Sequence, residues 1–373
     1  MSLLTLILFV AGFGLLIWGA DFLVRGASKL ALAVGISPLV VGLTVVAYGT
    51  SAPELAVSVQ SSFAGVADIA VGNVVGSNIA NVLLILGVSA VIAPLAVSTQ
   101  LVRFEVPLMI GVSLLVLGLG WDGSIGRGNG LLLFCGGIAY TVLAIWQSRR
   151  ETSANKNAPS SSSTDNEDPQ VPQHSEHILF QLGLIAIGLV LLVFGANWLV
   201  DGAVEIATYF GVSQLIIGLT VVAVGTSLPE MATSVVASLR GERDIAVGNI
   251  VGSNIFNILI VLGLSGAVSP LGLTVPASAL VFDIPVMIVV AFACLPVFFT
   301  GSLIARWEGA LFLGYYIAYV GYLILQVTQQ PLLPLFYFTM TVFVIPLTTL
   351  TLSISLFWAW QHRSDIELPT SKI

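Results

Sequence analysis

Two glutamates, Glu54 and Glu230, stand inside apolar stretches of the chain. A charged side chain at the centre of a bilayer costs roughly 2.5 to 3.5 kcal/mol on insertion scales, so such a residue indicates a functional site. Each glutamate ends the same pattern, Gly-Thr-Ser-x-Pro-Glu, and no Lys or Arg lies in the same apolar stretch. Two carboxylates that meet would repel each other unless a cation or a proton joins them.

The proline before each glutamate is expected to break the helix that carries it. Pro53 and Pro229 have no N–H, so carbonyls about four residues earlier lose their helical partner. Gly49 and Gly225 loosen the same turn. Non-helical backbone at membrane depth is tolerated only where it lines a cavity or is buried in protein. We therefore predict two broken helices that present carbonyls, hydroxyls and a carboxylate, a set of oxygens that suits a hard cation such as Ca²⁺.

A second polar pattern, Gly-Asn-x-Val-Gly-Ser-Asn-Ile-x-Asn, follows each glutamate. Three of its polar residues are spaced by four and share one helix face, which we expect to complete an oxygen cage. They are Asn73, Ser77 and Asn81 in the first copy and Asn249, Ser253 and Asn257 in the second. Asn73 and Asn249 could instead only tie helices together. Asn78 and Asn254 lie off this face and are expected to pack or bond elsewhere.

The composition is that of an integral membrane protein. Of 373 residues, 57% are hydrophobic and 8% charged, and the mean hydropathy is +1.03, whereas soluble domains have about 25% charged residues. Eleven stretches approach the about 20 apolar residues that a spanning helix needs. They are 3–24, 38–62, 69–92, 103–120, 129–148, 178–200, 214–238, 245–268, 280–299, 306–327 and 332–360. We predict an all-α fold with eleven spans, or ten if the last does not cross.

The chain is duplicated. A shift of 176 residues carries both polar patterns of the first copy onto the second, and 19–27 also matches 195–203. Five helices per copy is an odd number, so the second copy must enter the membrane from the opposite side, and inverted repeats of this kind place substrate sites at their interface. The predicted units are a first repeat at 1–148, a cytoplasmic disordered linker at 149–177, a second repeat at 178–327 and an extra C-terminal helix with a cytoplasmic tail at 328–373.

The basic residues favour one orientation. With the N-terminus outside, nearly all of them fall on the cytoplasmic side, as the positive-inside rule requires. They are Arg25, Lys29, Arg103, Arg149, Arg150, Lys156, Arg240, Arg243 and Arg306, joined by Arg363 and Lys372 if the eleventh segment spans. Only Arg127 falls outside.

The histidines, the cysteines and the remaining acids in or near the spans do not indicate a second ion-binding site. The three histidines lie outside the spans, and Cys135 and Cys294 lie in different spans without metal-ligand spacing, where we expect both to be buried. Four further acids lie near helix ends, where solvent or the helix dipole would accommodate them. These are Asp21, Glu105, Asp283 and Glu308.

The doubled motif resembles the alpha repeats of the calcium/cation antiporter superfamily, and most closely its prokaryotic sodium/calcium exchanger branch. The resemblance covers 1–327. Calcium/proton exchangers of that superfamily carry Gly-Asn-x-x-Glu in place of Gly-Thr-Ser-x-Pro-Glu. Many relatives have Asp at one of the positions held here by Asn81 and Asn257, so the two asparagines argue against K⁺ dependence and remove a protonatable group. The eleventh segment departs from the usual plan of ten helices.

The resemblance implies a cluster of four cation sites. Ca²⁺ would bind to Glu54, Glu230 and the backbone oxygens of Thr50 and Thr226. Na⁺ would bind to the same glutamates with Ser51, Ser77, Ser227, Ser253 and the carbonyls of Ala47 and Ala223. The residues that would line the site are Asn73, Asn81, Asn249 and Asn257.

The expected function is therefore antiport of Ca²⁺ against Na⁺ at a shared site, in a multi-pass protein of a prokaryotic plasma (inner) membrane. The expected partners are Ca²⁺, Na⁺ and the lipid bilayer. No cofactor, enzymatic activity, nucleic acid or nucleotide is expected. Two alternatives remain: an antiporter of the same fold that uses protons or another divalent cation, and a cation channel. The inverted repeat with two broken helices favours a carrier, because a channel needs no site that faces each side in turn.

Overall fold

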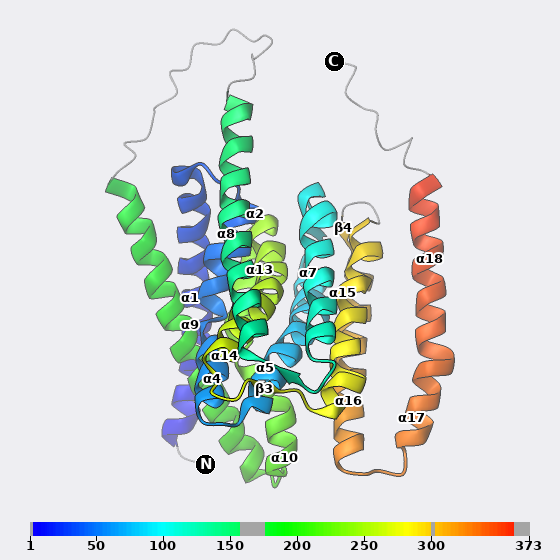
Figure 1. Cartoon of the computed structure of the whole chain (residues 1–373). Coiled ribbons are helices and arrows are strands. Elements are labelled where there is room, and N and C mark those ends of the chain that lie inside the picture. Colours follow the sequence, from blue (N-terminus) through cyan, green and yellow to red (C-terminus); the bar gives the residue numbers. More distant parts are fainter. Residues whose placement is uncertain (1–2, 157–175, 300–302, 362–373) are drawn as a thin grey trace.

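The computed structural model describes residues 3–156, 176–299 and 303–361, and these are almost entirely helical. Within these ranges, nine helices are long and apolar enough to cross a membrane. Pro38–Thr50 and Ala52–Phe63, which meet at 49°, pass the same test together, so that the bent pair is a tenth candidate. The predicted all-α membrane fold is confirmed (Figure 1). The predicted span at 214–238 is divided into short helices by its own break.

The elements of the first half are α1 (Leu3–Val34), α2 (Pro38–Val41), η1 (Gly42–Val46), α3 (Ala47–Thr50), α4 (Ala52–Phe63), α5 (Ala67–Ala80), η2 (Asn81–Leu86), α6 (Gly87–Ile92), β1 (Leu95–Ala96), η3 (Leu101–Glu105), α7 (Val106–Leu119), β2 (Ser124–Ile125) and α8 (Arg127–Lys156), where η marks a π-helical turn. α8 continues into the predicted linker, most of which lies outside the described residues.

The elements of the second half are α9 (Glu176–Tyr209), α10 (Gln214–Ile217), η4 (Gly218–Val222), α11 (Ala223–Gly225), α12 (Leu228–Leu239), α13 (Arg243–Phe256), η5 (Asn257–Leu262), α14 (Gly263–Val268), β3 (Leu273–Thr274), η6 (Ala279–Asp283), α15 (Ile284–Phe299), β4 (Leu303–Ile304) and α16 (Arg306–Val327). The chain continues with α17 (Leu333–Thr339), η7 (Met340–Val344) and α18 (Ile345–Gln361).

The two halves have the same elements in opposite directions. Each π-helical turn of the first half recurs at the matching place in the second. β1 pairs antiparallel with β4, and β2 with β3, so each short strand pairs with one from the other half. The two pairs lie at opposite ends of the bundle (Figure 1). This exchange of ends is what the inverted repeat predicts.

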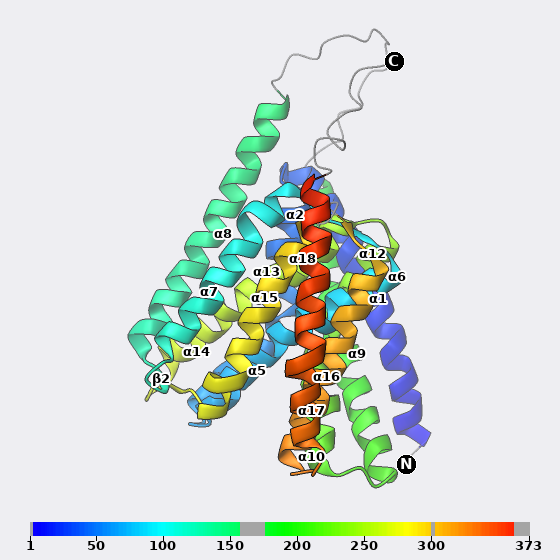
Figure 2. The same cartoon turned by 90° about the vertical axis from the view of Figure 1, so that its right-hand side faces the viewer.

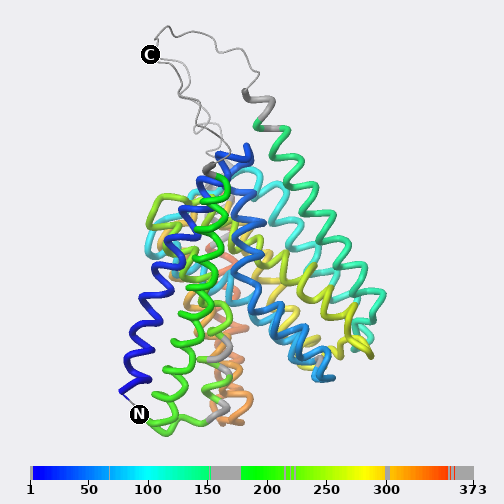
Figure 3. The backbone as a smooth tube through the Cα atoms, turned by 90° about the vertical axis from the view of Figure 1, so that its left-hand side faces the viewer, coloured from blue at the N-terminus to red at the C-terminus, as the bar shows by residue number. Residues whose placement is uncertain are grey.

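α1 and α9 cross at paired glycines. They run side by side (Figure 3), and a methyl group at Gly19 would lie 2.8 Å from the carbonyl oxygen of Gly188. Gly12 and Gly195 face each other in the same way, at 2.9 Å. Because residue numbers rise along α1 as they fall along α9, the helices are antiparallel. Small residues at both contacts let the backbones approach closely.

The centre of the bundle joins the halves. α5 and α13 belong to the two most deeply buried candidate spans. A methyl group at Gly252 of α13 would lie 2.6 Å from the carbonyl oxygen of Leu43 in η1. The first broken helix therefore packs directly against the polar helix of the second half, which places the two polar patterns together.

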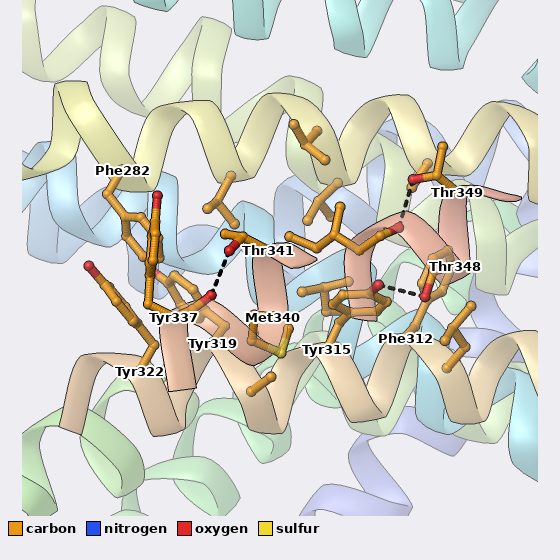
Figure 4. A pocket seen from close by; sticks show the side chains of 18 of the residues that line it. Phe282, Phe312, Tyr315, Tyr319, Tyr322, Tyr337, Met340, Thr341, Thr348 and Thr349 are labelled. Atoms are coloured by element: carbon orange, nitrogen blue, oxygen red, sulfur yellow. Dashed lines mark hydrogen bonds between the residues drawn. The ribbon is translucent and has the colours of Figure 1, made fainter. Parts of the chain in front are cut away.

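The C-terminal helices lie on the outside of the bundle. α17 and α18 pass in front of α16 (Figure 2). A cavity of about 340 Å³ separates them from α15 and α16, lined almost entirely by aromatic and aliphatic side chains (Figure 4). The Tyr315 hydroxyl donates to Thr348 Oγ1 across it at 2.7 Å. Neither Glu54 nor Glu230 lines this cavity.

Candidate cation site

Both broken helices are interrupted at a serine. Ser51, between α3 and α4, has φ −85° and ψ 10°, and Ser227, just before α12, has φ −90° and ψ 6°. Pro53 and Pro229 each stand in the first turn of the helix that follows, where a missing N–H has no partner to lose. The two predicted breaks are therefore present and have the same backbone geometry.

The two glutamates meet where the halves join. Glu54 and Glu230 lie in the first turns of α4 and α12, and each is 1% exposed. Ser51 Oγ donates to Glu230 Oε1 at 2.7 Å, and Ser227 Oγ donates to Glu54 Oε1 at 3.4 Å. Each half thus supplies a hydroxyl to the glutamate of the other half, and the carboxylates interact electrostatically.

Each carboxylate keeps one buried oxygen without a partner. Glu54 Oε2 and Glu230 Oε2 accept no hydrogen bond from any residue that the structure describes, and no Lys or Arg among those residues forms an ion pair with either glutamate. An unsatisfied buried acceptor costs about 1 to 3 kcal/mol, and more when it is charged. The pair of acids is therefore complete only with a cation or a proton.

The threonines and alanines of the motif stand just before the two breaks. Thr50 Oγ1 donates to Asn249 Oδ1 at 3.2 Å and is 3.4 Å from the carbonyl oxygen of Ala47. Thr50 and Thr226 each stand directly before the serine of a break. Ala47 and Ala223 begin the short helices α3 and α11, directly before the breaks.

Asn73 and Asn249 bond the broken helices through the backbone of each glutamate. Asn73 Nδ2 donates to the Glu54 carbonyl oxygen at 3.2 Å and to Ser58 Oγ at 2.9 Å. Asn249 Nδ2 donates to the Glu230 carbonyl oxygen at 3.4 Å and to Ser234 Oγ at 3.0 Å. Both bond the backbone of a glutamate, so they tie helices together as well as bordering the site.

The serines and last asparagines of the same stripe are buried as well. Ser253 Oγ is 3.1 Å from Ser51 Oγ, and Ser77 is buried. Asn81 and Asn257 are each 1% exposed, and each has an Oδ1 without a partner among the described residues. Like each glutamate, each of these asparagines therefore keeps one buried oxygen without a partner among the described residues.

Sequence reasoning missed Asn78 and Asn254. Their amides bond Asn257 and Asn81 of the opposite half, at 3.1 and 3.0 Å. Both residues lie one position beyond the serine of the stripe, so the spacing of four excluded them. The signal that could have found them is that both copies repeat an asparagine at this position.

The site gathers many acceptor oxygens, including those of two acids, around the two breaks. Carboxylate and amide oxygens are the ligands that hard cations prefer, and Ca²⁺ takes six to eight of them in flexible geometry. Across the described ranges, no group of three or more His, Cys, Asp or Glu residues could hold a metal ion. Two carboxylates balance the charge of one divalent cation.

The remaining acids correct one expectation. Glu105 is fully buried rather than solvated, because Tyr140 donates to it at 2.7 Å and Gln100 at 3.1 Å. Glu308 is also buried, and it caps α16 by accepting the backbone N–H of Ala305 at 2.8 Å.

The cysteines correct another expectation, since both had been expected inside the protein. Cys294 is buried in α15, but Cys135 is exposed on α8. The prediction of burial is therefore wrong for Cys135.

Fold and site together define a membrane protein whose inverted halves meet at a buried acidic cluster. Comparison with known proteins gives the family. The profile described as Sodium/calcium exchanger protein matches residues 4–146 and 180–325. The chain belongs to this family, whose members are transporters rather than enzymes.

Individual relatives agree with this assignment. The chain is 42% identical to CaxA of Alkalimonas amylolytica over 274 residues, which cover 72% of this chain and 82% of CaxA. It is 32% identical to the sodium/calcium exchanger MaX1 of Methanosarcina acetivorans over 340 residues, which cover 84% and 97%. A solved structure of the sodium-calcium exchanger NCX_Mj, soaked with 10 mM Na⁺ and zero Ca²⁺, superposes with a TM-score of 0.71 at 30% identity and covers 86% of this chain and 99% of that one. The protein is therefore a multi-pass membrane antiporter for cations.

Proposed function

We propose that the protein exchanges Ca²⁺ for Na⁺ at the pocket between Glu54 and Glu230. The observation that carries this proposal is the pair of buried Oε2 atoms, one from each half, which lack a partner among the described residues. Ca²⁺ neutralises both carboxylates at once, whereas Na⁺ ions occupy the same oxygens together with the nearby serines. Because the two loads share ligands, they exclude each other, and exchange follows.

The ion-binding residues remain those that the sequence indicated. Ca²⁺ binds the two glutamates with Thr50 and Thr226. Na⁺ ions bind the glutamates with oxygens of Ser51, Ser77, Ser227, Ser253, Ala47 and Ala223. Asn73, Asn81, Asn249 and Asn257 border the pocket. The contacts between these residues support this assignment, because they join both halves at one place.

Access alternates when α1 and α9 move together along the rest of the bundle. Their glycine contacts hold them to each other, and α1 also packs along α12, the helix that carries Glu230. Displacement of this pair uncovers one broken helix and covers the other, so the same site faces each side in turn. The ion gradients and the membrane potential drive the cycle, at about 2.3 kcal/mol per charge per 100 mV.

The N-terminus lies outside in this proposal. The backbone N–H of Ser37 donates to Ser148 Oγ at 2.8 Å, so the α1–α2 loop lies beside the end of α8 that carries Arg149 and Arg150. Arg127 lies at the other end of α8. Basic residues gather on the cytoplasmic side of membrane proteins, which makes the end with Arg149 cytoplasmic.

Flux into proteoliposomes tests the proposed coupling. We expect Ca²⁺ uptake into Na⁺-loaded vesicles and little uptake into vesicles that carry only a proton gradient. Uptake driven by protons would replace Na⁺ coupling by proton coupling. Uptake without any counter-ion would indicate a channel and contradict antiport.

A further inference from the structure

Four buried asparagines form a crossed cluster between the halves. Asn81 Nδ2 donates to Asn254 Oδ1 at 3.0 Å, and Asn257 Nδ2 donates to Asn78 Oδ1 at 3.1 Å. All four are at most 2% exposed. Each bond joins one half to the other, and the two bonds are related by the repeat.

We call Asn81 and Asn257 the inner asparagines, and Asn78 and Asn254 the outer asparagines. The two hydrogen bonds decide whether the oxygen or the nitrogen of each inner amide faces the pocket. A primary amide has an oxygen that accepts and a nitrogen that donates. In Asn81 and Asn257 the nitrogen is bound, and the oxygen is left without a partner among the described residues. A cation is attracted by the oxygen and repelled by the NH₂ group. An inner amide turned by 180° would therefore weaken the site.

The outer asparagines are held in turn by methionines. Asn254 Nδ2 donates to Met109 Sδ at 3.4 Å, and Asn78 Nδ2 donates to Met287 Sδ at 3.7 Å. Asn78 Nδ2 also donates to the backbone carbonyl of Asn254 at 3.2 Å. A thioether and a carbonyl accept but do not donate. They therefore fix the nitrogen side of each outer amide and leave its oxygen for the inner asparagine.

We propose that Asn78 and Asn254 are positioning residues for the cation site. Each accepts the amide N–H of the inner asparagine from the opposite half, and each thereby keeps that amide's oxygen toward the pocket. The inference rests on the proposed function, which names Ca²⁺ as the ion and has Asn81 and Asn257 border the pocket. It assigns a role to residues that do not themselves bind the ion.

The first test is Asn254→Leu in the full-length purified protein. Without its acceptor, Asn81 turns freely, and we expect Ca²⁺ binding measured by calorimetry in Na⁺-free buffer to weaken about tenfold, equivalent to ~1.4 kcal/mol. Ser89→Ala is the control. Ser89 lies on α6, which follows the helical turn that begins with Asn81, and it is also buried and polar. Its Kd should equal that of the wild type. An unchanged Kd in Asn254→Leu overturns the proposal.

A double-mutant cycle separates positioning from general damage. In an Asn81→Ala background there is no amide to orient, so Asn254→Leu should weaken Ca²⁺ binding by less than about twofold. The same tenfold loss in both backgrounds would mean that Asn254 acts on the structure in general, and it would overturn the proposal.

A milder variant serves if Asn254→Leu does not fold. Met109→Leu nearly conserves volume, a change that cores usually tolerate, but it removes the acceptor that orients Asn254. We expect Ca²⁺ binding about threefold weaker, a part of one hydrogen bond's contribution. Wild-type affinity in Met109→Leu would contradict the chain of orientation from Met109 to Asn81.

Failure of this proposal differs from failure of the proposed function. A wild-type protein that binds Ca²⁺ but does not exchange it for Na⁺ overturns the coupling, while the affinities of the variants still test the asparagines. A wild-type protein that exchanges both ions, with an Asn254→Leu variant of equal Kd, overturns only the positioning.

Discussion

The two broken helices carry one motif, but the rest of the molecule covers them differently. In α12, which α1 packs along, only the last residue, Leu239, is exposed. In α4, the matching helix, Ala52, Ala56, Val57 and Gln60 are exposed, and α9 makes its main contact with the first broken helix at α3. The structure therefore covers α12 more fully than α4, and we call these the covered side and the open side.

Two polar contacts fasten the covered side, and we call them the α1 latch. Asp21 of α1 forms an ion pair with Arg240, and Ser28 Oγ donates to Glu242 Oε1 at 2.7 Å. The positions related to these by the repeat are Asn197, Ala64, Val204 and Val66. They can form neither contact. The two halves share one fold, but only α1 has these two contacts. They stabilise the arrangement in which α1 covers α12.

The substitutions with the largest expected effect are those of the two acids. They test whether Glu54 and Glu230 contribute equally, although α12 is covered and α4 is more exposed. We expect Glu54→Gln and Glu230→Gln each to reduce Na⁺-dependent Ca²⁺ uptake in proteoliposomes more than ~100-fold, because breaking a buried ionic contact costs about 3 to 5 kcal/mol. Protein yield should be unchanged. Uptake like that of the wild type in either variant would remove that glutamate from the site.

The next effect concerns the pair of helices that covers α12. Gly19→Ala places a methyl group 2.8 Å from backbone atoms of α9, and forced packing of this kind costs about 1 to 3 kcal/mol. We expect a lower Tm and slower exchange. Gly14→Ala is the control, because a methyl group there meets nothing within 4 Å, and its Tm should not fall. Equal Tm values for the two variants would contradict the close crossing.

Breaking the α1 latch should have a smaller effect. An exposed ion pair contributes about 0 to 1 kcal/mol, so Arg240→Ala should raise the opening of the covered side up to about fivefold. The measure is the maleimide reactivity of Ala232→Cys on α12, in a Cys135→Ala background. Arg243→Ala, which removes an exposed arginine of the same turn, should leave this rate unchanged. Equal rates in both variants would mean that the latch does not hold α1.

The smallest effect would come from building the missing latch on the open side. Asn197→Asp with Ala64→Arg recreates the ion pair at the related positions. We expect maleimide to modify Ala56→Cys on α4 about twofold more slowly, since one surface pair contributes under about 1 kcal/mol. Either substitution alone should have no effect. A faster rate in the double variant would show that α9 does not approach α4 as the repeat predicts.

The sequence indicated the two acids of the site more readily than the long-range contacts that surround them. Glu54 and Glu230 could be paired from the sequence because each follows a helix-breaking proline and lies where an acid is costly. The four-residue spacing then predicted that Asn81 and Asn257 face the broken helices. These inferences need only local geometry and an internal repeat, and both can be read from one chain.

The contacts that the sequence did not reveal join distant segments. Arg240 lies 219 residues from Asp21, and their ion pair depends on how α1 crosses α12. The bond from Asn81 to Asn254 depends on the register of two helices from opposite halves. Glu105 is near a helix end, but Tyr140 of the next span covers it. Helix crossings leave no periodic signal, so these partners could not be read from spacing.

The serine of each half donates a hydrogen bond to the glutamate of the other half, and this has a consequence for the order of synthesis. Ser227 leaves the ribosome 173 residues after Glu54, the acid to which it donates. Glu54 therefore enters the translocation machinery before half of its final neighbourhood has been translated. Assembly of the pocket is a late event, and an ion captured there would report that the broken helices of both halves have been made.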